Sequence, residues 1–159
     1  MAIQINKYLD FDFQLVGQID PIKDHAGVII GEFPQSRYKN YKSTPLNKYG
    51  TGPFCRFQIA KKAKTSGIYL IKVNQTVLYV GECENLAKRF SSNGYGGISP
   101  RNCFVGGQET NCRINNLIYL AFLQEQQLSL WFYQTDFDKY VRRELENNLI
   151  RLLKPVWNR

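Results

Sequence analysis

The segment SGIYLIKVNQTVLYVGE, residues 66–82, constrains the fold more than any other part of the sequence. It contains two short apolar runs, 67–73 and 77–81, which are separated by a polar break and bordered by glycine. Runs of this length that are rich in Ile, Val, Leu and Tyr are typical of strands, and a short polar break between them indicates a hairpin. The segment therefore predicts two adjacent antiparallel strands.

Each run carries one tyrosine, Tyr69 and Tyr79, and the length of the connecting loop decides whether the two phenols share a face of the sheet. A two-residue loop would place them on opposite faces, whereas a three-residue loop, 74–76, would make them diagonal neighbours on one face. Asn74-Gln75 lacks the glycine that a two-residue turn prefers. We therefore predict the three-residue loop and both phenols on one face, either for aromatic packing or for a shared active site.

The remaining pattern after the hairpin predicts three helices and one more strand. The expected elements are a short helix over 84–90, a glycine-rich loop over 93–111, a helix over 112–126, a strand over 128–133, and a helix that begins after Thr135 and ends at about Leu153, before Pro155. This order predicts an α/β (α+β) fold, in which a small, three-stranded, mainly antiparallel sheet is flanked by helices.

Residues 1–66 are less periodic, with short strands predicted over 13–19 and 27–33 and a long loop over 34–53. We predict that residues 1–66 form an N-terminal extension, basic and aromatic from residue 34, that packs on a core formed by residues 67–159.

The charge of the chain is unevenly distributed. The formal net charge is +8, and no acidic residue occurs between Phe33 and Gly81, where lysines and arginines alternate with aromatic residues. Such a stretch favours binding to a nucleic acid, because clustered cations release the counterions of a polyanion and aromatic side chains add contacts to sugars and bases. The alternative is a solvated basic face without a ligand. From this stretch, Lys61, Lys62 and Lys64 are candidate DNA-binding residues.

Other classes of protein fit the sequence less well. No stretch approaches the about 18 apolar residues of a membrane span, and the N-terminus lacks the apolar region of a signal peptide. We therefore expect a cytoplasmic protein with no membrane partner. The cysteines form no C-x-x-C pair, so we expect reduced thiols, and the spacing supports a four-cysteine zinc site poorly. They are Cys55, Cys83, Cys103 and Cys112.

Five sequence elements occur in a characteristic order: GIY (67–69), YVG (79–81), Arg89, and a tail, LENNLIRLLKPVWN, that contains Glu146 and Asn158. Together they resemble the GIY-YIG nuclease family over about residues 66–159, and the tail is similar to that of the bacterial excision-repair nuclease. The loop GYGGISPRNCFVGGQETNCRIN also resembles a subset that includes type II restriction endonucleases. The resemblance implies a GIY-YIG-like fold and metal-assisted hydrolysis of DNA.

The resemblance also implies a role for each matching residue. Tyr69 would orient or deprotonate the attacking water, and Tyr79 would complete the site or share that role. Arg89 would contact a phosphate oxygen and stabilise charge in the transition state. Asn158 would support the site, so we expect the C-terminus to be tied down, with Trp157 as its anchor.

The sequence departs from the family at one point. Many members have a histidine or lysine near the second tyrosine or just after the arginine, but Glu82 and Asn93 stand at these places. The single histidine lies far away in the sequence. Lys72, Lys88 or Tyr95 are the residues that could substitute for the missing helper.

Helical spacing separates the two glutamates of the last helix. Glu144 falls on a polar stripe, whereas Glu146 falls beside the apolar ridge that includes Leu145 and Leu149. A carboxylate at the margin of a buried face needs a partner. That partner is either an arginine such as Arg89 or a divalent metal, and the family pattern favours Glu146 as the ligand of Mg²⁺ or Mn²⁺.

The glycine-rich loop and the start of the next helix contain groove-competent donors, namely Arg101, Gln108, Asn111 and Arg113. These residues are candidates for contacts with DNA. The alternative is an ordered loop in which the glycines serve only the fold.

These observations predict a metal-dependent endonuclease that hydrolyses double-stranded DNA, of the sequence-specific type II restriction kind, acting as a homodimer on DNA or by repeated visits. One alternative is a structure-specific repair or mobile-element nuclease. Another is a nucleic-acid-binding module that has kept the fold and lost catalysis, which the missing helper supports and the intact tyrosines, arginine, glutamate and asparagine oppose.

Overall fold

The computed structural model describes residues 2–61 and 63–158, so Lys62 lies outside the described residues. The chain divides into two compact units. The first comprises Met1–Ile19, Ile59–Lys88 and Gln126–Arg159, and the second comprises Asp20–Gln58 and Arg89–Glu125. Each unit contains its own cluster of buried apolar side chains.

Among the described residues, six strands form one sheet with the order β1-β2-β8-β6-β7, and β5 pairs with β2. The pairings β1–β2, β2–β8, β8–β6 and β6–β7 are all antiparallel. Their bounds are β1 Ile5–Tyr8, β2 Phe11–Pro21, β5 Phe57–Ile59, β6 Gly67–Val73, β7 Thr76–Cys83 and β8 Leu128–Gln134. The predicted α+β class is confirmed, whereas the predicted number of three strands is wrong.

The additional strands come from the first 66 residues. The predicted strand over 13–19 lies within β2, which pairs with β8 from Gln14↔Phe132 to Gln18↔Ser129. Phe13 is fully buried in the core of the first unit, together with Ile68 and Leu70 of β6. Burial of this apolar side chain stabilises the attachment of β2 to the sheet that contains the hairpin.

The hairpin has a different turn from the predicted one, yet it brings the phenols to the same face. Val73 pairs with Thr76, so the loop contains two residues, and Asn74 adopts the left-handed conformation with φ 51°. Asparagine tolerates this region, which is why no glycine is needed. The register then shifts between Ile71 and Lys72, where Leu78 is the extra residue of a β-bulge. The bulge reverses the parity that the short turn would otherwise impose.

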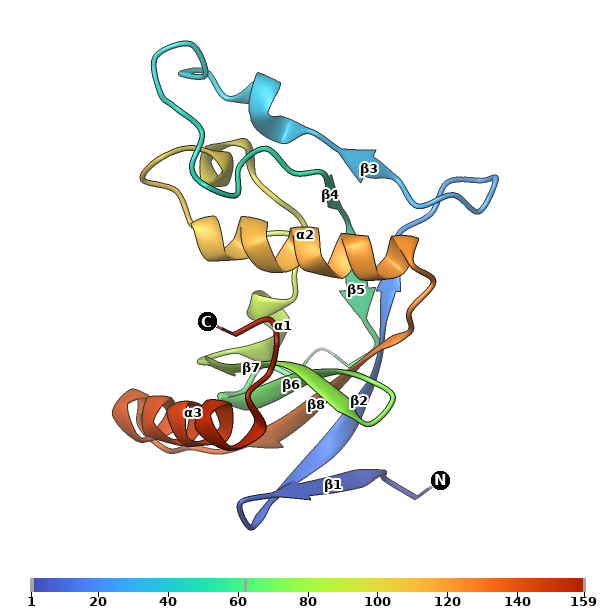
Figure 1. Cartoon of the computed structure of the whole chain (residues 1–159), viewed down its shortest axis with the longest axis vertical. Coiled ribbons are helices and arrows are strands. Elements are labelled where there is room, and N and C mark those ends of the chain that lie inside the picture. The colour runs from blue at the N-terminus through green and yellow to red at the C-terminus, as the bar shows by residue number, and fades with distance from the viewer. Residues whose placement is uncertain (1, 62, 159) are drawn as a thin grey trace. The chain divides into compact units, whose positions relative to one another are not determined.

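The last helix, α3, extends over Lys139–Leu153 and packs against β7 and β6 (Figure 1). Asp138 caps its first turn, because its carboxylate accepts a hydrogen bond from the Val141 N–H at 2.9 Å. The predicted end at Leu153 is confirmed. The predicted start, directly after Thr135, is corrected to Lys139. The residues between them form a short connection, in which the Thr135 hydroxyl accepts a hydrogen bond from the Phe137 N–H.

Leu145 and Leu149 of α3 enter the core of the first unit. They meet side chains from the α3-facing side of the sheet. Those side chains are Phe13, Ile68, Leu70, Val80 and Trp131.

The second unit is built around α2, Glu109–Leu123, which packs on β4, Phe54–Cys55. β4 pairs with β3, Gly31–Glu32, in a separate two-stranded sheet. The helix begins three residues before the predicted Cys112. Asn115 is fully buried, and its amide bonds to the N–H and C=O of Cys55 and to the C=O of Tyr95.

The glycine-rich segment before α2 is an ordered loop that contains the 3₁₀ helix η2, Pro100–Cys103. Gly96 and Gly97 are buried, and a Cβ added to either would lie 2.8 Å or less from a backbone oxygen of Phe57 or Ser92. These glycines therefore allow the close approach of the chain to itself, as the purely structural alternative requires.

No helix in the described part of the chain is long and apolar enough to cross a membrane. All four cysteines are buried free thiols. Within residues 2–61 and 63–158, no group of three or more His, Cys, Asp or Glu side chains is placed to hold a metal ion.

Candidate active site

The two hairpin tyrosines lie side by side on one face of the sheet. Tyr69 pairs with Gly81 and Ile71 pairs with Tyr79, and directly opposed residues share a face. The ring centroids of Tyr69 and Tyr79 are 6.0 Å apart, with 37° between the ring planes. Both side chains are buried, with exposed fractions of 1% and 7%. The predicted proximity of the phenols is confirmed.

The geometry explains the two glycines that flank these tyrosines. The ring of Tyr69 lies over Gly81, so a Cβ at that position would overlap the phenol. A Cβ at Gly67 would overlap the backbone oxygen of Tyr133 and the ring of Phe132, both on β8. The glycines of GIY and YVG therefore leave room for aromatic rings on neighbouring strands.

The C-terminal tail runs along β7, the strand at the end of the sheet order. The Asn158 Nδ2 donates to the Val80 C=O at 2.8 Å, and the Asn158 Oδ1 accepts from the Val80 N–H at 2.8 Å. The Trp157 N–H donates to the C=O of Leu78, the bulge residue, at 2.9 Å. The tail thus satisfies backbone groups that an edge strand leaves unpaired, and the expected attachment of the C-terminus is confirmed.

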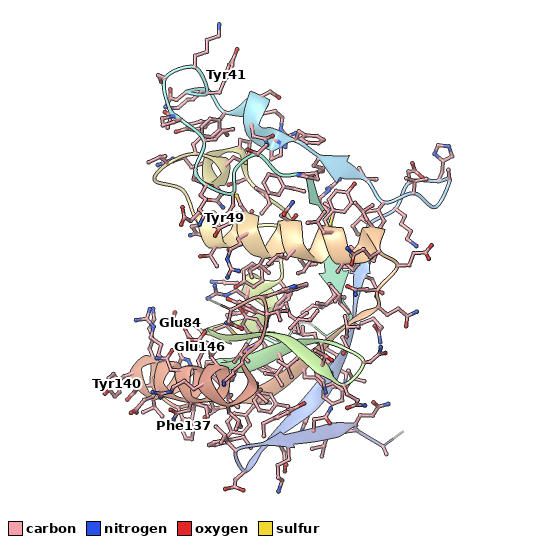
Figure 2. The ribbon with its side chains drawn as sticks, in the orientation of Figure 1. Tyr41, Tyr49, Glu84, Phe137, Tyr140 and Glu146 are labelled. Atoms are coloured by element: carbon pink, nitrogen blue, oxygen red, sulfur yellow. The ribbon has the colours of Figure 1, made fainter. Side chains whose placement is uncertain are left out.

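Glu146 lies on α3, on the side of the helix toward the hairpin and near Glu84 (Figure 2). Its side chain is half-buried, whereas Glu144 is exposed, as the helical spacing predicted. Leu145 and Leu149, on either side of it in sequence, are buried in the core. A metal at Glu146 would take one protein carboxylate and fill its remaining positions with water and phosphate oxygens, which is the usual mode for Mg²⁺. The residues present therefore fit such an ion.

Sequence reasoning missed Arg142, which lies one helical turn before Glu146. Its Nε is 3.1 Å from the Glu82 Oε2, and its Nη1 donates to the Phe137 C=O at 2.7 Å. The side chains of Arg142 and Glu82 are 6% and 11% exposed. Glu82, which stands where a helper base was sought, is therefore one half of a buried ion pair that joins β7 to α3.

Lys72 also has a structural setting. Its ammonium group donates to the Tyr8 hydroxyl at 3.1 Å and lies 4.9 Å from the ring centroid of Trp131. Trp131 packs on the side of the sheet that faces α3, so Lys72 is directed away from the two phenols. This placement removes Lys72 from the set of substitute helpers.

Arg89 ends α1, Leu86–Arg89, a helix of one turn that Asn85 caps by accepting from the Lys88 N–H at 3.0 Å. Arg89 is half-buried and belongs to the second unit, where its guanidinium lies 5.7 Å from the ring centroid of Tyr95. Asn93 is exposed.

The expected DNA-reading residues of the second unit differ in exposure. Arg101 is exposed, although its Nη1 donates to the Val105 C=O at 3.1 Å. Asn111 is buried, and its amide donates to the Gln108 Oε1 at 2.8 Å. Arg113 is half-buried, and in the first unit Lys61 and Lys64 are exposed. Asn111 therefore has an evident structural role, and the arginines and lysines are better placed for contacts with a ligand.

Over 95 residues, 60% of the chain, the sequence is 30% identical to the UvrABC system protein C of Fusobacterium nucleatum subsp. nucleatum. The chain resembles the GIY-YIG nucleases. The match covers 13% of that relative, so the chain spans only a small part of its length. No family model matches the chain.

Two solved structures are also similar to this chain. Both are the GIY-YIG N-terminal endonuclease domain of UvrC from Thermotoga maritima, as tyrosine point mutants bound to a catalytic divalent cation. They are 21% and 16% identical to this chain, cover 62% of it, and have TM-scores of 0.40 and 0.39. The matches cover 88% and 87% of the two domains.

Proposed function

We propose that the protein is a metal-dependent DNA endonuclease, which hydrolyses phosphodiester bonds with Mg²⁺ or Mn²⁺. The observation that carries the proposal is the pair of buried phenols, Tyr69 and Tyr79, 6.0 Å apart on one face of the hairpin. Aromatic packing alone accounts for the burial of the rings. It does not account for the tail, in which the Asn158 amide is bonded to the residue between Tyr79 and Gly81.

In this proposal each residue has a defined task. Tyr69 orients the attacking water and accepts its proton, and Tyr79 holds the Tyr69 hydroxyl or the water in place by hydrogen bonding. A phenol, with a pKa of about 10, accepts a proton only as the phenolate, so the reaction needs cations close to the phenol to favour that form. Arg89 binds a non-bridging phosphate oxygen, and Asn158 fixes the strand that carries Tyr79.

Glu146 is the proposed metal ligand. The ion, when bound, acts as a Lewis acid at the phosphate and stabilises the leaving oxygen. A single carboxylate at the margin of a helix leaves most of the coordination shell to water and substrate, which suits a metal that must contact the scissile phosphate.

We propose double-stranded DNA as the substrate and cleavage at a specific sequence, with two copies of the chain acting on the two strands. The net charge of +8 and the acid-free stretch between Phe33 and Gly81 support a polyanionic partner. A structure-specific repair nuclease is the second candidate, and the similarity to the UvrABC system protein C favours it.

The test is to incubate the purified chain with plasmid DNA and Mg²⁺ or Mn²⁺, with and without EDTA. Glu146→Gln should abolish cleavage. The matched control is Glu144→Gln, at an exposed position two residues earlier on the same helix, and this variant should retain cleavage. Discrete fragments would support the sequence-specific enzyme, whereas nicking confined to branched or damaged DNA would support the repair nuclease. DNA binding without cleavage under either metal would overturn the proposal in favour of an inactive binding module.

A further inference from the structure

A hollow of ≈ 570 Å³ opens in the first unit. This volume lies within the range of about 300–1,000 Å³ that is typical of ligand sites. Its walls come from β2, β8 and the segment that leads to β6. The lining residues are Asp12, Gln14, Leu15, Val16, Lys61, Ala63, Phe132, Tyr133 and Gln134.

The strand registers connect this hollow to the catalytic tyrosine. Gly81 pairs with Tyr69, Tyr69 pairs with Phe132, and Phe132 pairs with Gln14. Directly opposed residues share a face, so these four form one row across β7, β6, β8 and β2 on the face that bears the phenols. Tyr69 and Gln14 are two strand spacings apart, roughly 10 Å. That distance is about three times the 3.4 Å rise per nucleotide of a DNA strand.

The chemistry of the hollow fits a nucleotide. Gln14 and Gln134 are exposed amides, and Gln134 lies two positions after Phe132 on the same strand and therefore on the same face. An amide offers one acceptor and two donors, and glutamine can read the edge of a base by two hydrogen bonds. Phe132, a buried aromatic residue, also lines the hollow and adds an apolar surface to it.

Charge in the hollow is compatible with a phosphate. Lys61 is an exposed cation on its wall. The carboxylate of Asp12 also lines the hollow, and it forms an exposed ion pair with the Lys7 ammonium group at 3.8 Å. A lysine here would contact the DNA backbone and position the strand without reading its sequence.

We propose that this hollow, the Gln14–Gln134 groove, binds one nucleotide of the substrate strand within about three nucleotides of the scissile phosphate. The two amides contact the base edge and Lys61 contacts the adjacent phosphate. The inference rests on the proposed function and deepens it, because it makes the N-terminal strand β2 part of the substrate site and gives the enzyme a means of sequence discrimination.

The experiment selects sequences from a random duplex library with the full chain carrying Glu146→Gln, in the presence of Mg²⁺. Gln14→Ala and Gln134→Ala should each reduce the preference for a base at one position by about 10-fold. Gln18→Ala, an exposed amide on β2 outside the groove, should leave every preference unchanged. Lys61→Ala should weaken binding to all sequences alike and lower the salt dependence.

A loss of fold is distinguished by two further measurements. The unfolding midpoint of each variant should match that of the parent, and Gln14→Glu should change the preferred base instead of erasing the preference, because a carboxylate accepts from cytosine. If the Gln14→Ala, Gln134→Ala and Gln18→Ala variants select the same bases with the same preference, the proposed groove is wrong. Plasmid cleavage by the unaltered chain tests the proposed nuclease activity separately. Either proposal, the nuclease activity or the nucleotide-binding groove, can therefore be rejected without the other.

Discussion

The side-chain amide of Asn158 forms two hydrogen bonds with the backbone of Val80, the residue that follows Tyr79 in the hairpin. A side-chain amide therefore makes the backbone hydrogen bonds that a further strand would make at this edge of the sheet. The bonded residue is next in sequence to Tyr79, a candidate catalytic residue. Residues 157 and 158 are thus held against the strand that carries Tyr79.

Asn158→Ala is expected to lower the free energy of unfolding by about 1–2 kcal/mol, because the variant loses two hydrogen bonds to a half-buried strand edge. Urea unfolding measures this change. Val156→Ala is the matched control, since Val156 is 75% exposed and its truncation should change stability by less than about 0.5 kcal/mol. Equal stability of the two variants would show that the tail is not held by the amide.

The ion pair between Arg142 and Glu82 is expected to be costly to break from one side. Arg142→Met leaves a buried carboxylate without its cation, so the free energy of unfolding should fall by about 3–5 kcal/mol. The double variant Arg142→Met/Glu82→Gln should recover a large part of that loss. Arg143→Met, at an exposed position on the same helix, should change stability little.

The Arg142 and Glu82 variants also test whether the ion pair positions α3 against β7. Arg142 lies one helical turn from Glu146, so a loosened contact between α3 and β7 should lower the cleavage rate of folded variants as well. A double variant no more stable than Arg142→Met would show that the carboxylate is not left uncompensated, and it would contradict the pairing.

Local sequence patterns predicted the elements whose evidence lies close together in the chain. The hairpin, the end of α3 at Leu153 and the half-buried setting of Glu146 follow from the apolar runs, helical spacing and proline of short segments. The prediction that Tyr69 and Tyr79 share a face is correct, although the three-residue loop from which it was derived is wrong. A bulge at Leu78 leaves no mark in the turn residues, and here it compensates for the shorter loop.

Contacts between distant segments could not be predicted in this way. β2 and β8 pair although most of the sequence lies between them. Arg142 and Glu82 form an ion pair although they are 60 residues apart in the sequence. The hydrophobicity of residues 13–19 indicated a strand but not its neighbour, because many pairings would bury Phe13 equally well. For the same reason the Gln14–Gln134 groove was missed, since its two amides come from opposite ends of the sequence.

Gly81→Ala is expected to destabilise the protein by about 1–3 kcal/mol, because the added Cβ would overlap the ring of Tyr69. The backbone at Gly81 is outside the left-handed region, so strain does not contribute. In a Tyr69→Ala background, where the ring is gone, the same substitution should cost less than about 1 kcal/mol. Urea unfolding of the four proteins in this cycle measures both values, and equal costs in the two backgrounds would rule out the overlap.

Stability is expected to fall at alkaline pH because of Cys55. Burial, with a smaller contribution from the nearby Glu32 carboxylate, raises the pKa of the Cys55 thiol from 9.0 to about 12. Above about pH 9 the unfolded chain releases this proton and the folded chain retains it, so ionisation favours unfolding. The contribution of the protonated thiol is complete below about pH 9 and is lost as the pH rises toward 12, at up to about 1.4 kcal/mol per pH unit.

Urea unfolding of the reduced protein between about pH 8 and pH 10.5 checks this expectation. Cys55→Ala has no thiol to ionise at this position, so its stability should decline less steeply over the same interval than that of the parent chain. The difference between the two curves isolates Cys55 from the lysines and tyrosines that also titrate in this range. Parallel curves would mean that the Cys55 thiol ionises as readily in the folded state as in the unfolded state, and that its burial does not hold the proton.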